Sequence, residues 1–214
     1  MLMQRSTHMA SGSRLGGVAL LAALLMSLTA CTPPPQQPQP YPDVRWDGGA
    51  PTEFADSEWV MAVRASLEAQ AVARNRNDFT IKQLVDTTGP DLRDRLSASA
   101  VRTVSAGEVT RLLPGPWPFT PVVVDADGSG KAEVTGCLAT KWANDAGTPP
   151  PSFGAVGITY RLEQASGSIR VTSTAGADLD CSQTELPVGV FDPAPTPSGV
   201  TSIDDIVRAE PDAR

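Results

Sequence analysis

The sequence predicts an α+β domain in which helices precede an antiparallel sheet. Two observations lead to this prediction. Apolar residues recur at helical spacing between about residues 57 and 98, and apolar and polar residues alternate in segments after Val101. Helices that come before the strands, rather than between them, are typical of the α+β class. We therefore expect one α+β domain over residues 55–183.

The first expected helix has the clearest pattern. Asp56 or Ser57 can cap its N-terminus, and the polar residues 75–77 end it. Apolar side chains recur every four residues between these ends, at Trp59, Val63, Leu67 and Ala71. We interpret this stripe as core packing rather than as a platform for a ligand.

Two shorter helices are expected next. Residues 79–85 can form one of them, with Thr80 as its cap. Pro90 can open the other, which we expect to reach residue 98, because proline is favoured at the first helical position.

Four strands in two hairpins are expected after the helices. Their segments are residues 121–124, 132–142, 154–163 and 168–174. In the third segment Ile158, Tyr160 and Leu162 alternate with polar neighbours, as the single buried face of an antiparallel sheet requires.

The loop Asp-Ala-Asp-Gly-Ser-Gly at residues 125–130 has two interpretations. Asp125, Asp127 and Ser129 match the opening of a calcium-binding EF-hand loop. That loop needs a glutamate at its twelfth position, which is Gly136 here, and its flanks should be helices. Aspartate and glycine also suit a hairpin turn. We favour the hairpin and expect no cofactor; these three side chains are the remaining metal candidates.

Residues 1–30 have the features of a secretory signal peptide. Arg5 and Arg14 precede the uncharged apolar residues 15–26, and this run is too short to span a bilayer. The segment therefore predicts export.

The four residues after this run, Leu28, Thr29, Ala30 and Cys31, resemble the lipobox of bacterial lipoproteins. The resemblance implies that a signal peptidase recognises the first three and that Cys31 becomes the N-terminus and carries a diacylglyceryl group. Two acyl chains anchor a protein stably, which implies a place at the extracytoplasmic face of the cell membrane. An ordinary signal peptide followed by a chance cysteine is the alternative.

Proline-rich segments flank the expected domain. Seven prolines lie between Thr32 and Pro51, and such segments favour extended polyproline II at about 3.1 Å per residue. We interpret residues 31–54 as the lipidated cysteine and a linker, and residues 184–214 as a loose tail that holds one short helix at about residues 202–209.

Composition excludes several functions. Removing residues 1–30 takes away two of the 17 basic residues and none of the 24 acidic ones, which leaves a net charge of −9. A net-acidic surface argues against nucleic acid as a partner.

His8 is the sole histidine and is removed with residues 1–30, so histidine-based triads and metal sites are excluded. Asp178 and Asp180 are the nearest carboxylate pair for acid–base chemistry, but they fit a solvated loop better. We expect no enzyme.

Two cysteines remain besides Cys31, namely Cys137 and Cys181. An even pair in an exported domain indicates a disulfide. A metal site would lack further cysteine or histidine ligands, and a catalytic thiol would lack an imidazole partner. We therefore predict that Cys137 and Cys181 are bonded.

The order of elements, with Gly136 and Cys137 inside a long strand, resembles the cone-shaped fold of ketosteroid isomerases, SnoaL-like proteins and nuclear transport factors. Such a domain after a lipobox and a proline-rich stalk resembles the arrangement often found in lipoproteins of high-GC Gram-positive bacteria. The resemblance covers about residues 55–183 and implies helices packed on a curved, cone-like sheet. No Asp–Tyr or Asp–His pair matches the pocket residues of the catalytic members. A plain two-layer sandwich without a pocket is the alternative fold.

Three functions follow from these observations. The first is a lipid-anchored domain that binds a protein or another component of the cell envelope. The second is a domain that binds a small ligand in the cavity of the cone, and the third is a carboxylate-based enzyme. A deep apolar pocket would favour the second function, whereas a filled interior would favour the first.

Overall fold

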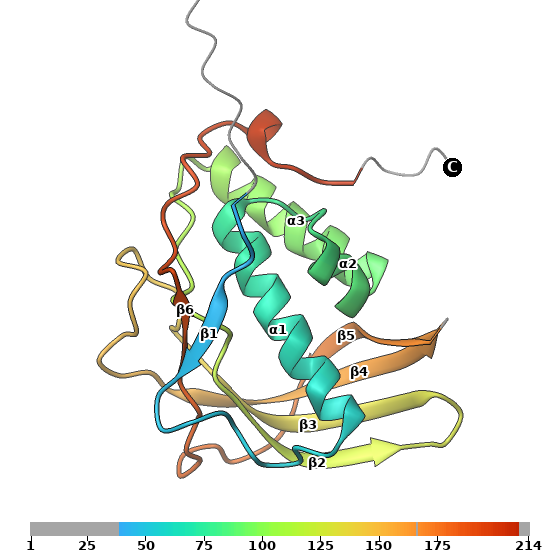
Figure 1. Ribbon diagram of the computed structural model, residues 1–214. Coiled ribbons are helices and arrows are strands. Elements are labelled where there is room, and N and C mark those ends of the chain that lie inside the picture. The colour runs from blue at the N-terminus through green and yellow to red at the C-terminus, as the bar shows by residue number, and fades with distance from the viewer. Residues whose placement is uncertain (1–38, 166, 210–214) are drawn as a thin grey trace, which may run out of the picture. The chain divides into compact units, whose positions relative to one another are not determined.

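The structure, a computed structural model, describes residues 39–165 and 167–209 (Figure 1). Its helices are α1 (Glu58–Arg76), α2 (Lys82–Thr87) and α3 (Pro90–Ser105), and a short 3-10 helix, η1, covers Ile203–Asp205. An antiparallel sheet of four strands follows α3 in the chain, in the order β2 (Phe119–Ala126), β3 (Lys131–Ala139), β4 (Ala155–Ala165) and β5 (Ser168–Gly176). A separate two-stranded sheet pairs β1 (Asp43–Trp46) with β6 (Gly189–Asp192).

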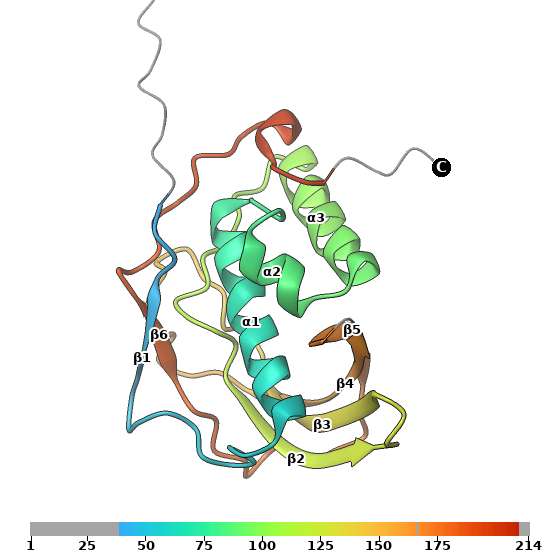
Figure 2. The same ribbon diagram turned by 45° about the vertical axis from the view of Figure 1, so that its right-hand side comes forward.

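The predicted fold class is confirmed. Figure 2 shows the four-stranded sheet curling around α1, with α2 and α3 beside this helix and next to β5. The two expected hairpins form, because Val124 of β2 lies opposite Val134 of β3 and Leu162 of β4 lies opposite Val171 of β5. Val134 also lies opposite Tyr160, which joins the two hairpins into one sheet. The domain is therefore a layer of helices on a curved antiparallel sheet.

The helix α1 forms as its sequence predicts and is the centre of the domain. The hydroxyl of Ser57 accepts a hydrogen bond from the backbone N–H of Val60 (3.4 Å), which caps the N-terminus. Val60, Val63 and Leu67 are buried against the sheet, whereas Trp59 of the predicted stripe is only half-buried. In its second half the helix is buried on several sides, at Ala69, Ala71, Val72 and Ala73. These small side chains let neighbouring elements approach closely.

The C-terminus of α1 ties distant segments together. Asn77 adopts a left-handed conformation (φ 52°), which asparagine tolerates better than most residues, and this ends the helix. Its side-chain amide donates to the hydroxyl of Ser198 (2.8 Å), and its carbonyl accepts from the N–H of Val207 (2.9 Å). Two residues earlier, the Asn75 amide both donates to and accepts from the backbone of Leu113, each at 2.8 Å. The polar residues 75–77 therefore hold other segments against α1 as well as ending the helix.

The two shorter helices differ from the prediction at their ends. Thr80 is not the cap of α2, which begins at Lys82 and has no side-chain cap. Instead, the backbone N–H and the hydroxyl of Thr80 both donate to the carboxylate of Asp78 (2.9 and 2.7 Å), so its oxygen is used in a local turn. Pro90 opens α3 as predicted, but the helix continues to Ser105 because Leu92, Leu96 and Val104 keep one side packed in the core.

The strand β3 ends earlier than the prediction of residues 132–142. After Ala139 the chain turns away at Lys141, which has a positive φ of 57°. The next residue, Trp142, is buried in a core cluster with Phe191, and its indole N–H donates to the carbonyl of Gly115 (3.1 Å). The chain therefore leaves the sheet after Ala139, and Trp142 is buried beside the sheet instead of pairing with β4.

The segments expected to be a linker and a loose tail enter the folded body. Val44 of β1 pairs with Phe191 of β6, and Phe191 is 4% exposed. Ile206 is buried between α1 and α3, and Val207 accepts a hydrogen bond from the N–H of Phe79 (2.8 Å). The folded domain therefore includes β1, β6 and η1, because the apolar residues of both flanks cover the side of α1 that the main sheet leaves open.

Candidate functional site

The interior between α1 and the sheet is packed with side chains. Tyr160 lies at its centre, and its ring meets that of Phe119 edge-to-face, with the centroids 5.2 Å apart. Val63 and Leu162 pack in the same cluster. The hydroxyl of Tyr160 is buried and has no hydrogen-bond partner in the described part of the chain, and burial raises the pKa of this phenol. The interior is therefore apolar, with one polar atom that lacks a partner.

The hairpin interpretation of residues 125–130 is confirmed. Asp127 accepts hydrogen bonds from the N–H and hydroxyl of Ser129, both at 2.8 Å, and from the N–H of Lys131 (3.3 Å). These bonds, above all that from the Ser129 hydroxyl, hold the pKa of Asp127 below its usual value. The loop joins two strands, not two helices. No cluster of three metal-binding side chains occurs in residues 39–165 and 167–209.

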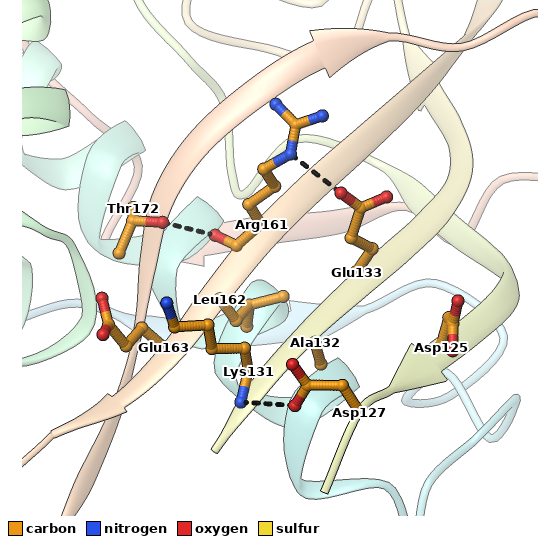
Figure 3. Close-up of a pocket in the computed structure, with 9 residues that line it drawn as sticks. All are labelled: Asp125, Asp127, Lys131, Ala132, Glu133, Arg161, Leu162, Glu163 and Thr172. Carbon is orange, nitrogen blue, oxygen red and sulfur yellow. Dashed lines mark hydrogen bonds and ion pairs between the residues drawn. The ribbon is translucent and has the colours of Figure 1, made fainter. Parts of the chain in front are cut away.

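A shallow hollow of about 360 Å³ lies beside this turn on strands β2 to β5 (Figure 3). One ion pair links two of its charged side chains. Arg161 donates to Glu133 at 2.8 Å across neighbouring strands, and the Thr172 hydroxyl donates to the carbonyl of Arg161 at 3.2 Å. Asp125 also lines the hollow, next to the turn. The geometry is that of a solvated sheet surface with cross-strand pairs.

The carboxylate pair considered for acid–base chemistry is on the surface. The side chains of Asp178 and Asp180 are both exposed. Asp180 accepts a hydrogen bond from the N–H of Ser182 (2.9 Å), which lowers its pKa. A general acid needs a raised pKa, so this environment does not suit Asp180 to that role.

The predicted disulfide between Cys137 and Cys181 is confirmed. The two Cα atoms are 5.7 Å apart, and both residues are buried. The bond ties the middle of β3 to the segment after β5. The lipobox residues Leu28, Thr29, Ala30 and Cys31 lie outside the described residues.

The best candidate for a binding site is an aromatic groove between α1 and the segments that flank the main sheet in the chain. We call it the tryptophan groove. Its volume is about 170 Å³, and it is lined by Trp46, Pro51, Arg64, Ala65, Leu67, Glu68, Pro116, Trp117, Phe119 and Pro187. These residues come from β1, the loop that joins it to α1, α1 itself, the start of β2 with the segment before it, and the segment before β6. The groove therefore exists only because both flanks of the chain fold onto α1.

A second hollow adjoins the groove and shares Pro51 and Pro187 with it. It is formed by residues 47–53 and 185–188 and has a volume of about 410 Å³. Its charged lining residues are all acidic: Asp47, Glu53 and Glu185. We call it the acidic hollow.

Arg64 is the basic residue of the groove, and two of its three guanidinium nitrogens have hydrogen-bond partners in the described residues. Its guanidinium donates to the carbonyl oxygens of Glu53 (3.0 Å) and Pro51 (3.5 Å). It also lies 3.9 Å from the carboxylate of Glu53. Arg64 thus fixes the loop that forms one wall of the groove.

Glu68 is the acidic residue of the groove and lies beside Tyr41. Burial raises the pKa of Glu68, and a hydrogen bond with the Tyr41 hydroxyl partly offsets this. The pKa of Tyr41 is raised in turn, first by burial and then by the charge of Glu68. On another wall, the guanidinium of Arg74 lies over the Trp117 ring at 5.0 Å from its centroid, which holds the indole in place.

Sequence reasoning did not identify this site. Trp46 lies in the segment interpreted as a linker, and Trp117 lies between the predicted helices and strands. Two tryptophans outside the expected elements were the signal in the sequence, because disordered segments contain few aromatic residues. Glu68 offered no signal beyond an ordinary helix surface.

The comparisons with known proteins add little. No model of a known protein family matches the chain, and no curated protein matches it. The chain is similar to the solved structure of an NTF-2-like protein of unknown function from Shewanella oneidensis MR-1, at 13% identity over 56% of this chain and 100% of that chain, with a TM-score of 0.33. It is also similar to a de novo designed β-sheet protein, at 18% identity over 59% of this chain and 98% of that one, with a TM-score of 0.30. The fold class follows from this chain's own helices and strands.

Proposed function

We propose that the protein is a bacterial lipoprotein at the extracytoplasmic face of the cell membrane, where its α+β domain binds another protein or envelope component. Two observations support the location. The sequence at Leu28–Cys31 follows a basic and then apolar leader, and the domain contains a disulfide, which is typical of proteins that leave the cytosol. No helix of the described residues is long and apolar enough to cross a membrane.

The tryptophan groove carries the proposal of binding. Trp46 and Trp117 are half-buried in a groove at the surface, beside a packed interior. Tryptophan is enriched at protein contacts because it offers a large apolar area and loses little entropy when it is held. A packed interior with an aromatic groove outside it supports binding of a macromolecular partner.

Binding rather than catalysis is the proposed mode of action. From Cys31 onward the sequence contains no histidine, which is the side chain whose ordinary pKa lies near neutrality. The pKa of the Glu68 carboxylate is raised, mainly by burial and further by the charge of Asp43, but among the described residues no serine, threonine, cysteine or lysine lines the groove beside it. The groove thus has the features of a contact surface.

The experiment uses the full chain in its own membrane. The chain with a C-terminal affinity tag is cross-linked in intact cells, and its partners are identified after solubilisation. We expect the protein in the membrane fraction and one dominant cross-linked envelope partner. The Cys31→Ala variant should leave the membrane or persist as a precursor. Wild-type protein in the cytosol, without a cross-linked partner, would contradict the proposal.

One observation favours a second candidate, the binding of a small ligand inside the domain. The buried Tyr160 hydroxyl lacks a partner and could donate a hydrogen bond to an apolar ligand with one acceptor. Testing a library of small apolar ketones by thermal shift would examine this function. Stabilisation of the wild type, and not of Tyr160→Phe, would support it.

A further inference from the structure

We propose that the tryptophan groove and the acidic hollow bind an extended, proline-containing peptide segment of a partner protein that carries a lysine or arginine side chain. The inference rests on the proposed binding function and names the chemistry of the partner. It is argued from the shape of the groove, its charge, and the composition of the chain around it.

The shape of the groove fits an extended segment better than a compact ligand. Sites for drug-sized molecules usually measure about 300–1,000 Å³, whereas the groove holds about 170 Å³. That space suits one or two side chains of a bound peptide. Its walls are Trp46, Trp117 and three prolines, at Pro51, Pro116 and Pro187. Aromatic-lined grooves of this kind bind proline-rich segments, which are already extended before they bind and lose little entropy.

The charge of the site fits a cation. The charged residues that line the groove and the adjoining hollow are Asp47, Glu53, Arg64, Glu68 and Glu185. Four of these are acidic. Arg64 lies 3.9 Å from the carboxylate of Glu53, so these two charges offset each other. Arg74 adds one cation over the Trp117 ring, against the carboxylates of Asp47, Glu68 and Glu185, which leaves the site with a net negative charge. A lysine or arginine of the partner would be attracted into the hollow while proline rings occupy the groove.

The chain's own proline-rich segment does not match this chemistry. Residues 32–44 contain prolines and glutamines but no lysine or arginine. The protein as a whole is acidic, with a formal net charge of −7 over all its residues, so a second copy is not an electrostatic match either. A basic segment of another protein therefore fits the groove and the hollow better than this chain's own segment or a second copy.

The test uses the full chain, purified from membranes in a non-ionic detergent. The probe is a fluorescein-labelled seven-residue peptide of alternating proline and arginine, and binding is followed by fluorescence anisotropy. In one matched peptide glutamine replaces arginine, and in the other glycine replaces proline. We expect binding of the first peptide and a loss of about tenfold or more in affinity for each of the others.

Two substitutions and one control test the site itself. Glu68→Gln keeps the shape of the groove but removes its charge, and Glu185→Lys reverses an exposed charge in the hollow. The double variant should bind the arginine peptide about tenfold more weakly than the wild type does. This difference in affinity should be larger at low salt, where the charges are less screened. Glu108→Lys makes the same charge reversal at an exposed position that does not line either hollow, and its affinity should stay within about twofold.

The possible outcomes separate this inference from the proposed function. If the envelope partner is still cross-linked but no cationic peptide binds, the inference fails and the proposed function stands. An equal loss of peptide affinity in Glu108→Lys would also overturn the inference, because the loss would then reflect the net charge of the protein and not this site. Self-association that is lost in the double variant would assign the groove to a second copy and overturn it too. Circular dichroism and thermal unfolding check that each variant is folded.

Discussion

Val44 lies directly opposite Phe191, and this pair joins the segment that leads into the domain to the segment that leads out of it. Phe191 is buried in a cluster with Trp142 and Leu113, and its backbone N–H donates to the carbonyl of Pro114 (2.8 Å). Because Trp46 of β1 and Pro187, just before β6, line the tryptophan groove, the pairing of β1 with β6 positions both residues as well as stabilising the domain.

The first prediction follows from this pairing. Phe191→Ala should lower the free energy of unfolding by about 3–5 kcal/mol, because it leaves a cavity in a packed cluster. Urea denaturation measures this change. Val109→Ala, at a side chain that is 81% exposed, is the control and should change stability by less than about 0.5 kcal/mol. A near-neutral Phe191→Ala would show that residues 184–209 are not part of the folded domain.

The second prediction concerns the disulfide. The bond between Cys137 and Cys181 closes a loop with a sequence separation of 44, and the chain-entropy model gives about 4 kcal/mol for such a loop. The double variant Cys137→Ser/Cys181→Ser should lose stability of this order. Thiol labelling of the denatured, non-reduced wild type should modify neither cysteine. Full labelling of both would refute the bond.

The third prediction is a pH dependence due to Glu68. Its pKa is raised in the folded protein, so folding favours its protonated form. Its contribution to stability is therefore greatest below its unfolded pKa of about 4.5 and is lost as the pH rises through the raised folded value. Glu68→Gln removes this dependence. The stability of the variant relative to the wild type should increase from pH 4.5 upward and then level off.

Urea denaturation of both proteins between pH 4 and pH 8 measures this difference. A constant difference across the range would mean that Glu68 titrates normally in the folded state. Glu108→Gln is the matched control at an exposed position and should give a difference that does not vary with pH.

The fourth prediction concerns the buried phenol. Tyr160→Phe removes a hydroxyl that is buried without a partner and keeps the ring that packs on Phe119. An unpaired buried hydroxyl costs free energy, so the variant should be as stable as the wild type or more stable by about 1 kcal/mol. A loss of more than 1 kcal/mol would show that the hydroxyl has a partner, such as a bound water molecule or ligand.

Local patterns explain what the sequence predicts correctly. The helix α1 has a capping serine, a repeated apolar face and an asparagine that ends it, all within one segment. The alternation at Ile158, Tyr160 and Leu162 likewise needs no distant partner to be recognised. The disulfide followed from counting two cysteines, because only one pairing was available within the domain.

Long-range packing explains what the sequence did not predict. Strands β1 and β6 have four residues each, which is too short for a periodic pattern, and each is stable only because the other is present. The prediction that Thr80 caps α2 is wrong, because its hydroxyl donates to the carboxylate of Asp78 instead. The tryptophan groove combines Trp46, Glu68 and Trp117 from segments far apart in the chain, so no single stretch of sequence contains it.

The most direct test of the proposed function is mass spectrometry of the N-terminal peptide of the protein extracted from membranes. The account predicts that this peptide begins at Cys31 and carries the mass of a diacylglyceryl group, with or without a further acyl chain on its amino group. An unmodified N-terminus, or one that begins at another residue, would contradict the proposal that this domain acts while anchored to the membrane.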